Sequence, residues 1–307
     1  MAAADTPSLS LPIDCVPGKT CYIEDYVDAD PGPGQRDFMC GLKSRNDHRG
    51  TDIMLLSFEA MEKGVNVLAA APGVVAATRD GVADQAVTPE TRAGIEGREC
   101  GNAVRVDHGD GWQTLYCHME RGSVQVRQGD PVARGAVLGK VGLSGMTNVP
   151  HVHIGVLKDG KVVDPFNPED RNTCGAAEGT GLWQSALAYD RAGLFTAGFS
   201  TAVPGFDAVK SGAARAAKAT PDQPLVLYGH AFYAEPGDHL SFTAQGPKGE
   251  VFRHDITLDD PKAQLFRAFG RKAPSGGWPT GDYRGYVRLQ RGQEVLALRH
   301  ADITVAP

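Results

Sequence analysis

The stretch GNAVRVDHGDGWQTLYCHM (residues 101–119) contains two runs of β-forming residues on either side of the turn signals at Asp107–Gly111. Such an arrangement is typical of a β-hairpin. Comparable runs recur at 73–80, 123–141 and 151–166. Each contains Gly-Asp or Asp-Gly pairs or is bounded by glycine. The pattern predicts an antiparallel β-domain with little helix.

This β-domain is predicted to span residues 36–172. Residues 1–35 are rich in proline and aspartate and contain two cysteines, so we expect an arm that is tied down by disulfides. Residues 173–183 have the composition of a linker. Strand-like runs return over 184–307, and their short lengths and turn signals predict a β-sandwich of the immunoglobulin-like kind. A short helix is expected within 206–219. The fold class is therefore mainly β.

The six cysteines all lie in the first 174 residues of the chain. An even number confined to one region favours a disulfide framework, which indicates an oxidising compartment. A cysteine-ligated zinc site is the alternative, but no Cys-x-x-Cys spacing occurs. The first residues lack the basic region and apolar core of a signal peptide, so we expect a mature start with an added methionine. The protein is expected to be periplasmic or secreted. The disulfide candidates are Cys15, Cys21, Cys40, Cys100, Cys117 and Cys174.

Composition excludes several classes of function. The chain has 307 residues, a formal net charge of −6, 41% hydrophobic and 22% charged residues. These values are ordinary for a globular protein, and the negative charge argues against a nucleic-acid partner. No run of about 18 apolar residues is present, so no membrane span is expected. The oligomeric state stays open.

The histidines indicate metal chemistry. His151 and His153 are two residues apart in a strand-like run, and residues i and i+2 of a strand point to the same face. His48 and Asp52 are four residues apart, and Gly50 allows the backbone to turn between them. Each motif alone has an ordinary structural interpretation. Together they can supply the three protein ligands that a catalytic zinc ion needs.

Three motifs in order carry a resemblance to a known family. They are His-x-x-x-Asp at 48–52, Tyr-x-His at 116–118 and His-x-His at 151–153, within family-like flanks. Residues 36–168 resemble the lysostaphin-type, or LytM-like, zinc endopeptidases, which cleave peptide bonds in bacterial cell walls. Met119 and Gly155 depart from the usual pattern, with methionine for leucine and glycine for an acidic residue.

The resemblance implies roles for five residues. His48, Asp52 and His153 would bind one Zn²⁺ per chain, and His118 and His151 would line the open side of the metal and assist catalysis. Which of these two histidines is the base stays open. The implied activity is that of a secreted zinc metalloendopeptidase.

Strand parity adds an expectation about one disulfide. On a regular strand, His118 would share a face with Tyr116 and line the cleft, and Cys117 would point away. The hairpin brings Cys100 near Cys117, so we expect this pair to be bonded, with a bulge near Cys100 to correct the register. The remaining cysteines are assigned as Cys15–Cys21 and Cys40–Cys174.

Three functions are consistent with these residues. The first is cleavage of peptide bonds in peptidoglycan cross-bridges or stem peptides. The second is cleavage of glycine-rich proteins, which would use the same site. The third is a non-catalytic role as a cell-wall-binding activator of another hydrolase, which is disfavoured because all three ligands and both assisting histidines are present. A peptide is the expected partner in the first two cases, and residues 79–99 are expected to form one wall of its cleft. The histidines of the C-terminal domain show no ligand spacing.

Overall fold

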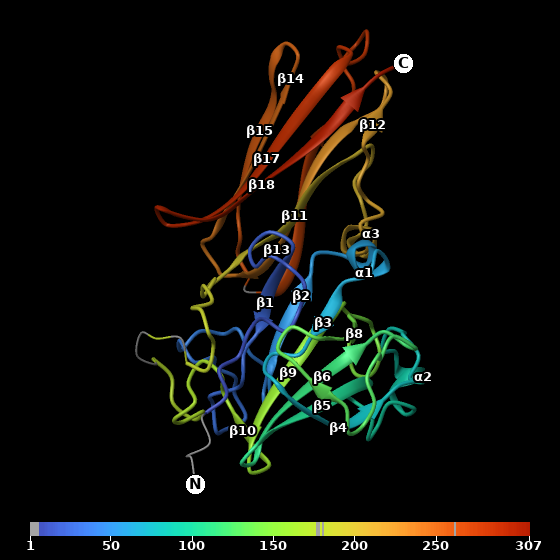
Figure 1. Ribbon diagram of the computed structural model, residues 1–307. Helices are drawn as coiled ribbons and strands as arrows, with labels where there is room; N and C mark the ends of the chain where they lie inside the picture. The colour runs from blue at the N-terminus through green and yellow to red at the C-terminus, as the bar shows by residue number, and fades with distance from the viewer. Residues whose placement is uncertain (1–5, 176–178, 180, 261) are drawn as a thin grey trace. The chain divides into compact units, whose positions relative to one another are not determined.

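The computed structural model describes residues 6–175, 179, 181–260 and 262–307 (Figure 1). The chain divides into two compact units, Met1–Tyr189 and Asp190–Pro307. The division therefore falls beyond the predicted linker 173–183, of which residues 176–178 and 180 lie outside the described residues. Trp183, at the end of that linker, is 3% exposed, because it packs into the core of unit 1 beside Leu9.

Unit 1 is built from short strands and two short helices, α1 (Phe58–Glu62) and α2 (Pro89–Arg92). Its strands are β1 (Cys21–Asp25), β2 (Thr51–Leu55), β3 (Asn66–Leu68), β4 (Gly73–Arg79), β5 (Asn102–Gly109), β6 (Trp112–Met119), β7 (Pro131–Val132), β8 (Val137–Lys140), β9 (His151–Lys158) and β10 (Lys161–Val163). The main sheet has the order β1-β2-β9-β6-β5-β4-β7, with β10 paired to β9, and every pair in it is antiparallel. β3 and β8 form a separate antiparallel pair. The predicted antiparallel β-domain is confirmed.

One face of the main sheet covers the hydrophobic core of unit 1. In β9, Val152, Ile154 and Val156 are at most 1% exposed and belong to this core. The strand period of two therefore sends His151 and His153 to the opposite face. The apolar face fixes the register, and the register decides which side chains meet on the other face.

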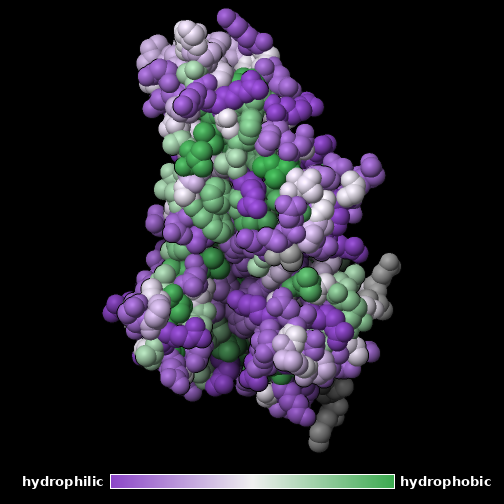
Figure 2. Space-filling view, turned by 180° about the vertical axis from the view of Figure 1, so that it is seen from behind, coloured by the Kyte–Doolittle hydropathy of each residue, from purple (hydrophilic) through white to green (hydrophobic). Residues whose placement is uncertain are grey.

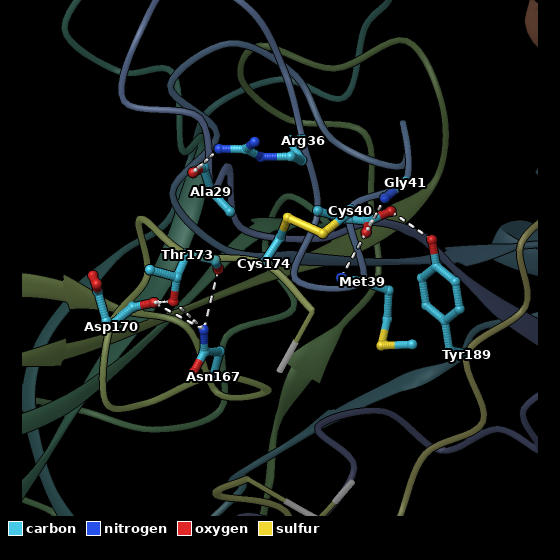
Figure 3. Close-up of a disulfide and its surroundings, with 11 residues drawn as sticks. Ala29, Arg36, Met39, Cys40, Gly41, Asn167, Asp170, Thr173, Cys174 and Tyr189 are labelled. Carbon is cyan, nitrogen blue, oxygen red and sulfur yellow. Dashed lines mark hydrogen bonds between the residues drawn. A yellow bond between two sulfur atoms is a disulfide. The ribbon is translucent and has the colours of Figure 1, made fainter. Parts of the chain in front are cut away.

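The N-terminal arm is part of this sheet, because β1 pairs with β2. Three disulfides are formed, Cys15–Cys21, Cys40–Cys174 and Cys100–Cys117, and they are the pairings expected from the sequence. The Cys40–Cys174 bond joins the segment after the arm to the start of the predicted linker (Figure 3). Beside it, the Tyr189 hydroxyl donates a hydrogen bond to the Asp37 carboxylate at 2.7 Å. These contacts hold the first and last segments of unit 1 together.

Unit 2 is a β-sandwich with one short helix, α3 (Phe206–Ser211), which lies in the segment expected to be helical. Its strands are β11 (Gly193–Ser200), β12 (Lys218–Ala219), β13 (Leu225–Ala234), β14 (His239–Gly246), β15 (Gly249–Thr257), β16 (Lys262–Arg271), β17 (Gly281–Arg291) and β18 (Glu294–Val305). Sheets of order β11-β13-β16 and β12-β18-β17-β14-β15 share one hydrophobic core. The mainly β fold class is confirmed in both units.

Hydrophilic residues cover most of the face seen in Figure 2, and hydrophobic residues appear between them in patches. Individual exposed apolar side chains, such as Val203 and Leu298, are ordinary on protein surfaces. Within the described residues, no helix is long and apolar enough to cross a membrane.

His230 is an unusual feature of the interior of unit 2. It is fully buried in β13, with its ring centroid 4.7 Å from that of Phe195 and 5.3 Å from that of Phe206. Burial in this aromatic environment lowers the pKa of His230 to about 4, although the Gln264 side chain offsets part of the shift. The imidazole is therefore neutral at pH 7.

His230 should make the stability of unit 2 depend on pH. Because the folded-state pKa lies below the unfolded value of 6.5, the unfolded chain binds the proton first. Stability that is complete above pH 6.5 should be lost as the pH falls towards 4, by about 3 kcal/mol at most. In His230→Phe this loss should disappear, as measured by hydrogen exchange of β13 amides across this pH range. The exposed His239→Gln variant is the control, and an unchanged pH slope in His230→Phe would contradict the prediction.

Candidate metal centre

Neighbouring strands align the predicted ligands in one row. Asp52 of β2 lies directly opposite His153 of β9, and His153 lies opposite Cys117 of β6. His151 is two residues from His153 and so shares its face. His48 comes from the loop that precedes β2 and completes the group. The antiparallel pairing therefore brings together residues that are about a hundred positions apart in the sequence.

Three side chains converge on one point. His48 Nε2 lies 3.3 Å from His153 Nδ1 and 3.2 Å from Asp52 Oδ2, and His153 Nδ1 lies 2.7 Å from Asp52 Oδ1. In the described part of the chain, this is the one group of three such residues whose donor atoms lie within 4.8 Å of one another. The His₂Asp set predicted from the sequence is therefore assembled in space.

This donor set fits a zinc ion. His48 Nδ1 donates a hydrogen bond to the carbonyl oxygen of Tyr26 at 2.7 Å, so the lone pair of Nε2 points toward His153 and Asp52. Tetrahedral ligands that bind one Zn²⁺ at about 2.0–2.1 Å lie roughly 3.3 Å apart, which matches the spacing of the two ring nitrogens. Two imidazoles and one carboxylate leave a fourth position open, as in a catalytic zinc site.

His118 reaches the same face by a different route from the one predicted. The pairing of β5 with β6 shifts between Asn102 and Val104, so β6 contains a bulge at Cys117–His118. His118 has a φ of 61°, and its N–H donates to the Cys100 carbonyl at 2.8 Å. The bulge expected near Cys100 is present, but it lies on the opposite strand.

The prediction that Cys117 points away from the cleft is wrong. Leu115 and Cys117 line the cleft, whereas Tyr116 is fully buried in the core. On a regular strand, His118 would have followed Tyr116 into the core face. The bulge and the positive φ break the alternation and turn the His118 imidazole into the cleft.

His118 and His151 stand beside the three converging residues. Their ring centroids are 4.6 Å apart, and His151 Nε2 lies 3.6 Å from Asp52 Oδ1. Each ring donates from Nδ1 to a backbone carbonyl, His118 to that of Ser144 at 2.8 Å and His151 to that of Val149 at 2.9 Å. These bonds leave Nε2 of both histidines as the proton acceptor.

Burial and charge separate the protonation states at this centre. Burial lowers the pKa of both His118 and His151, and nearby histidines lower that of His118 further, so both imidazoles are neutral at pH 7. Burial also acts to lower the pKa of His48, but the charge and hydrogen bond of Asp52 outweigh it and raise the pKa. Burial raises the pKa of Asp52, but the surrounding histidines outweigh it and hold the pKa well below its usual range.

His48, His118 and His153 line an open cleft of about 1050 Å³. Arg92 and Glu99 of the loop 79–99 line it, as expected from the sequence. Leu157 and Val162 add an apolar section of wall. The cleft thus combines polar side chains of the converging group with an apolar section of wall.

Three further residues, which belong to none of the three motifs, contribute to the site. Tyr26 holds His48 through its backbone carbonyl, and Arg45 forms ion pairs with Asp52 and with Asp25. Asp25 and Tyr26 lie in the predicted arm, outside the predicted peptidase domain. Arg45 lies three residues before His48 in the sequence, and this proximity is a signal for a role at the site.

Part of the chain is similar to known proteins. Residues 46–165 match the model of Peptidase family M23. The chain is 40% identical to the cell division protein DipM of Caulobacter vibrioides over 70 residues. This alignment covers 23% of this chain and 11% of DipM. The chain is 29% identical to the peptidoglycan DD-endopeptidase ShyA of Vibrio cholerae over 117 residues. This alignment covers 38% of this chain and 22% of ShyA. The matches thus span less than a quarter of these curated relatives.

A solved structure gives a weaker likeness. The catalytic domain of the prophage-encoded M23 protein EnpA from Enterococcus faecalis aligns with 49% of this chain and 92% of that chain, at 22% identity and a TM-score of 0.31. The family match, over residues 46–165, indicates the class of this region, which is similar to Peptidase family M23. The resemblance of the three motifs to lysostaphin-type enzymes is confirmed.

A substitution at Gly50 would test the geometry of the centre. A Cβ atom at Gly50 would lie 2.5 Å from His153 Nε2 and 2.6 Å from the Ile154 carbonyl oxygen. We expect Gly50→Ala to displace the His153 imidazole and weaken zinc binding by about 10-fold or more, measured by chelator competition. Gly155→Ala is the matched control, because a Cβ there would meet nothing closer than 3.5 Å. Equal affinities of the two variants would contradict the assignment.

Proposed function

We propose that unit 1 is a zinc metalloendopeptidase that hydrolyses peptide bonds in peptidoglycan cross-bridges or stem peptides. The observation that carries this proposal is the convergence of His48, Asp52 and His153 beside His118 and His151 at an open cleft. The M23 match supports a peptidase, and the relative named as a peptidoglycan DD-endopeptidase supports the substrate class.

His48, Asp52 and His153 would hold the metal ion. A zinc ion bound there would polarise the scissile carbonyl and lower the pKa of a water molecule to about 7. His118 and His151, which lie beside the three ligands, act on the attacking water and the scissile bond. Their Nε2 atoms are unprotonated at neutral pH, so either can take a proton from the attacking water and later give it to the departing amine.

Different backbone contacts hold the His118 and His151 imidazoles in place. The His118 imidazole is fixed by the bulge and by the Ser144 carbonyl, and His151 by the Val149 carbonyl, with the Thr147 hydroxyl 3.2 Å away. Once protonated, either imidazolium can donate to the oxyanion of the tetrahedral intermediate. The imidazole that takes the proton from the water is the one that can then stabilise this negative charge, and the other, still neutral, can accept a hydrogen bond from the water at Nε2.

The three disulfides indicate an oxidising compartment, and we propose a periplasmic or secreted location. Cell-wall peptide is accessible to enzymes there. Cleavage of glycine-rich proteins would use the same residues, so only substrates distinguish it. A non-catalytic wall-binding role would not need two neutral imidazoles beside an intact ligand set.

The ligand assignment predicts zinc content. The purified protein should contain close to one zinc ion per chain, and His48→Ala, Asp52→Ala and His153→Ala should each lose it, because two remaining ligands bind zinc weakly. Elemental analysis measures this directly. His239→Ala in unit 2 should keep its zinc. Metal retained in all three ligand variants would rule out the centre.

His118→Ala and His151→Ala should keep the zinc ion and lose turnover by roughly 10²–10⁴-fold, because acid–base assistance and oxyanion stabilisation act only on the reaction. The double variant should be less than additively slower, since both groups serve one intermediate. Mass spectrometry of digested sacculi, from walls with direct stem-peptide cross-links and walls with glycine bridges, would measure turnover. A glycine-rich protein serves as the third substrate. Wild-type turnover by both zinc-loaded variants would contradict the mechanism.

A further inference from the structure

Asp25 brings a second buried carboxylate to the metal centre. It lies at the end of β1, directly opposite Asp52 of β2 in the antiparallel register. Its side chain is 4% exposed, and that of Asp52 is 1% exposed. Two anionic side chains in adjacent, water-excluded positions repel each other unless a cation lies between them.

Arg45 supplies that cation. Its Nε lies 3.1 Å from Asp25 Oδ2, and a terminal guanidinium nitrogen donates a hydrogen bond to Asp52 Oδ2. The side chain is 56% exposed and lines the cleft. The planar guanidinium presents several N–H groups in fixed directions, so one Arg45 side chain can orient two carboxylates at once.

These contacts restrict how Asp52 can rotate. Oδ2 is held by Arg45 and lies 3.2 Å from His48 Nε2, and Oδ1 lies 2.7 Å from His153 Nδ1. The plane of the carboxylate is thereby fixed toward the two imidazoles. A group that orients a metal ligand in this way raises metal affinity without touching the ion.

We propose that Asp25 and Arg45 are a positioning pair that holds Asp52 ready for the metal ion. This inference rests on the proposed zinc site. Both members lie before residue 46, where the match to the peptidase family begins, so the N-terminal segment of unit 1 is an integral part of the centre. Asp25 has a second effect, because it neutralises Arg45, whose charge would otherwise compete with the metal cation for Asp52.

The decisive variant is the double substitution Asp25→Asn/Arg45→Gln. It leaves the net charge unchanged and removes only the orientation of Asp52. We expect zinc affinity, measured by competition with a chromogenic chelator, to fall about 10–100-fold. Asp25→Asn alone should bind zinc more weakly still, because the charge of Arg45 is then uncompensated. Arg45→Lys keeps the charge at a half-exposed position and should also weaken binding, since one ammonium group cannot bridge both carboxylates.

Asp47→Asn/Arg49→Gln is the matched control. Arg49 Nε lies 3.4 Å from Asp47 Oδ1, and both residues line the same cleft. The control therefore removes the same two charges as Asp25→Asn/Arg45→Gln, but from an ion pair that does not orient Asp52. This control should bind zinc as the wild type does, and circular dichroism and melting temperature verify the fold of every variant. Wild-type affinity in the folded Asp25→Asn/Arg45→Gln or Arg45→Lys protein would overturn the positioning pair and leave the zinc site intact. A wild-type protein that binds no zinc would overturn both proposals.

Discussion

The antiparallel register of four strands is the constraint on which the site depends. It places Asp25, Asp52, His153 and Cys117 opposite one another across β1, β2, β9 and β6. A slip of one residue would move every one of these side chains to the other face. The reverse face prevents that slip, because buried residues such as Ile53, Val152 and Ile154 would then be exposed. The hydrophobic core therefore determines the geometry of a polar site that it does not touch.

Two local features complete the site. The first is the left-handed conformation of His118, which costs about 1–3 kcal/mol for a non-glycine residue. The Cys100–Cys117 disulfide and the bond from His118 N–H to the Cys100 carbonyl hold this bulge in place. The second is Gly50, where a side chain would collide with His153. The strained conformation of His118 is thus held in place by a covalent bond and a hydrogen bond.

Local patterns were sufficient to predict much of the fold and of the site. Hairpin signals predicted the β-sheets, and three short motifs predicted the five histidine and aspartate residues that meet in the cleft. The orientation of His118 was not predictable, because strand parity assumes a regular strand and a bulge depends on the partner strand. Tyr26 acts through a carbonyl oxygen that every residue possesses, so it leaves no signature. Asp25 becomes relevant only through the pairing of β1 with β2, which is a non-local property.

The pKa values of two histidines near the Asp52 carboxylate shift in opposite directions. Burial alone would lower the pKa of His48, His118 and His151. For His48, whose Nε2 is 3.2 Å from Asp52 Oδ2, the carboxylate prevails and the pKa rises. For His118, burial and the neighbouring imidazoles prevail, and the pKa falls. A metal ion would compete with the proton at His48 and not at His118. The contact with one buried carboxylate therefore gives His48 a raised pKa where His118, which lacks that contact, has a lowered one.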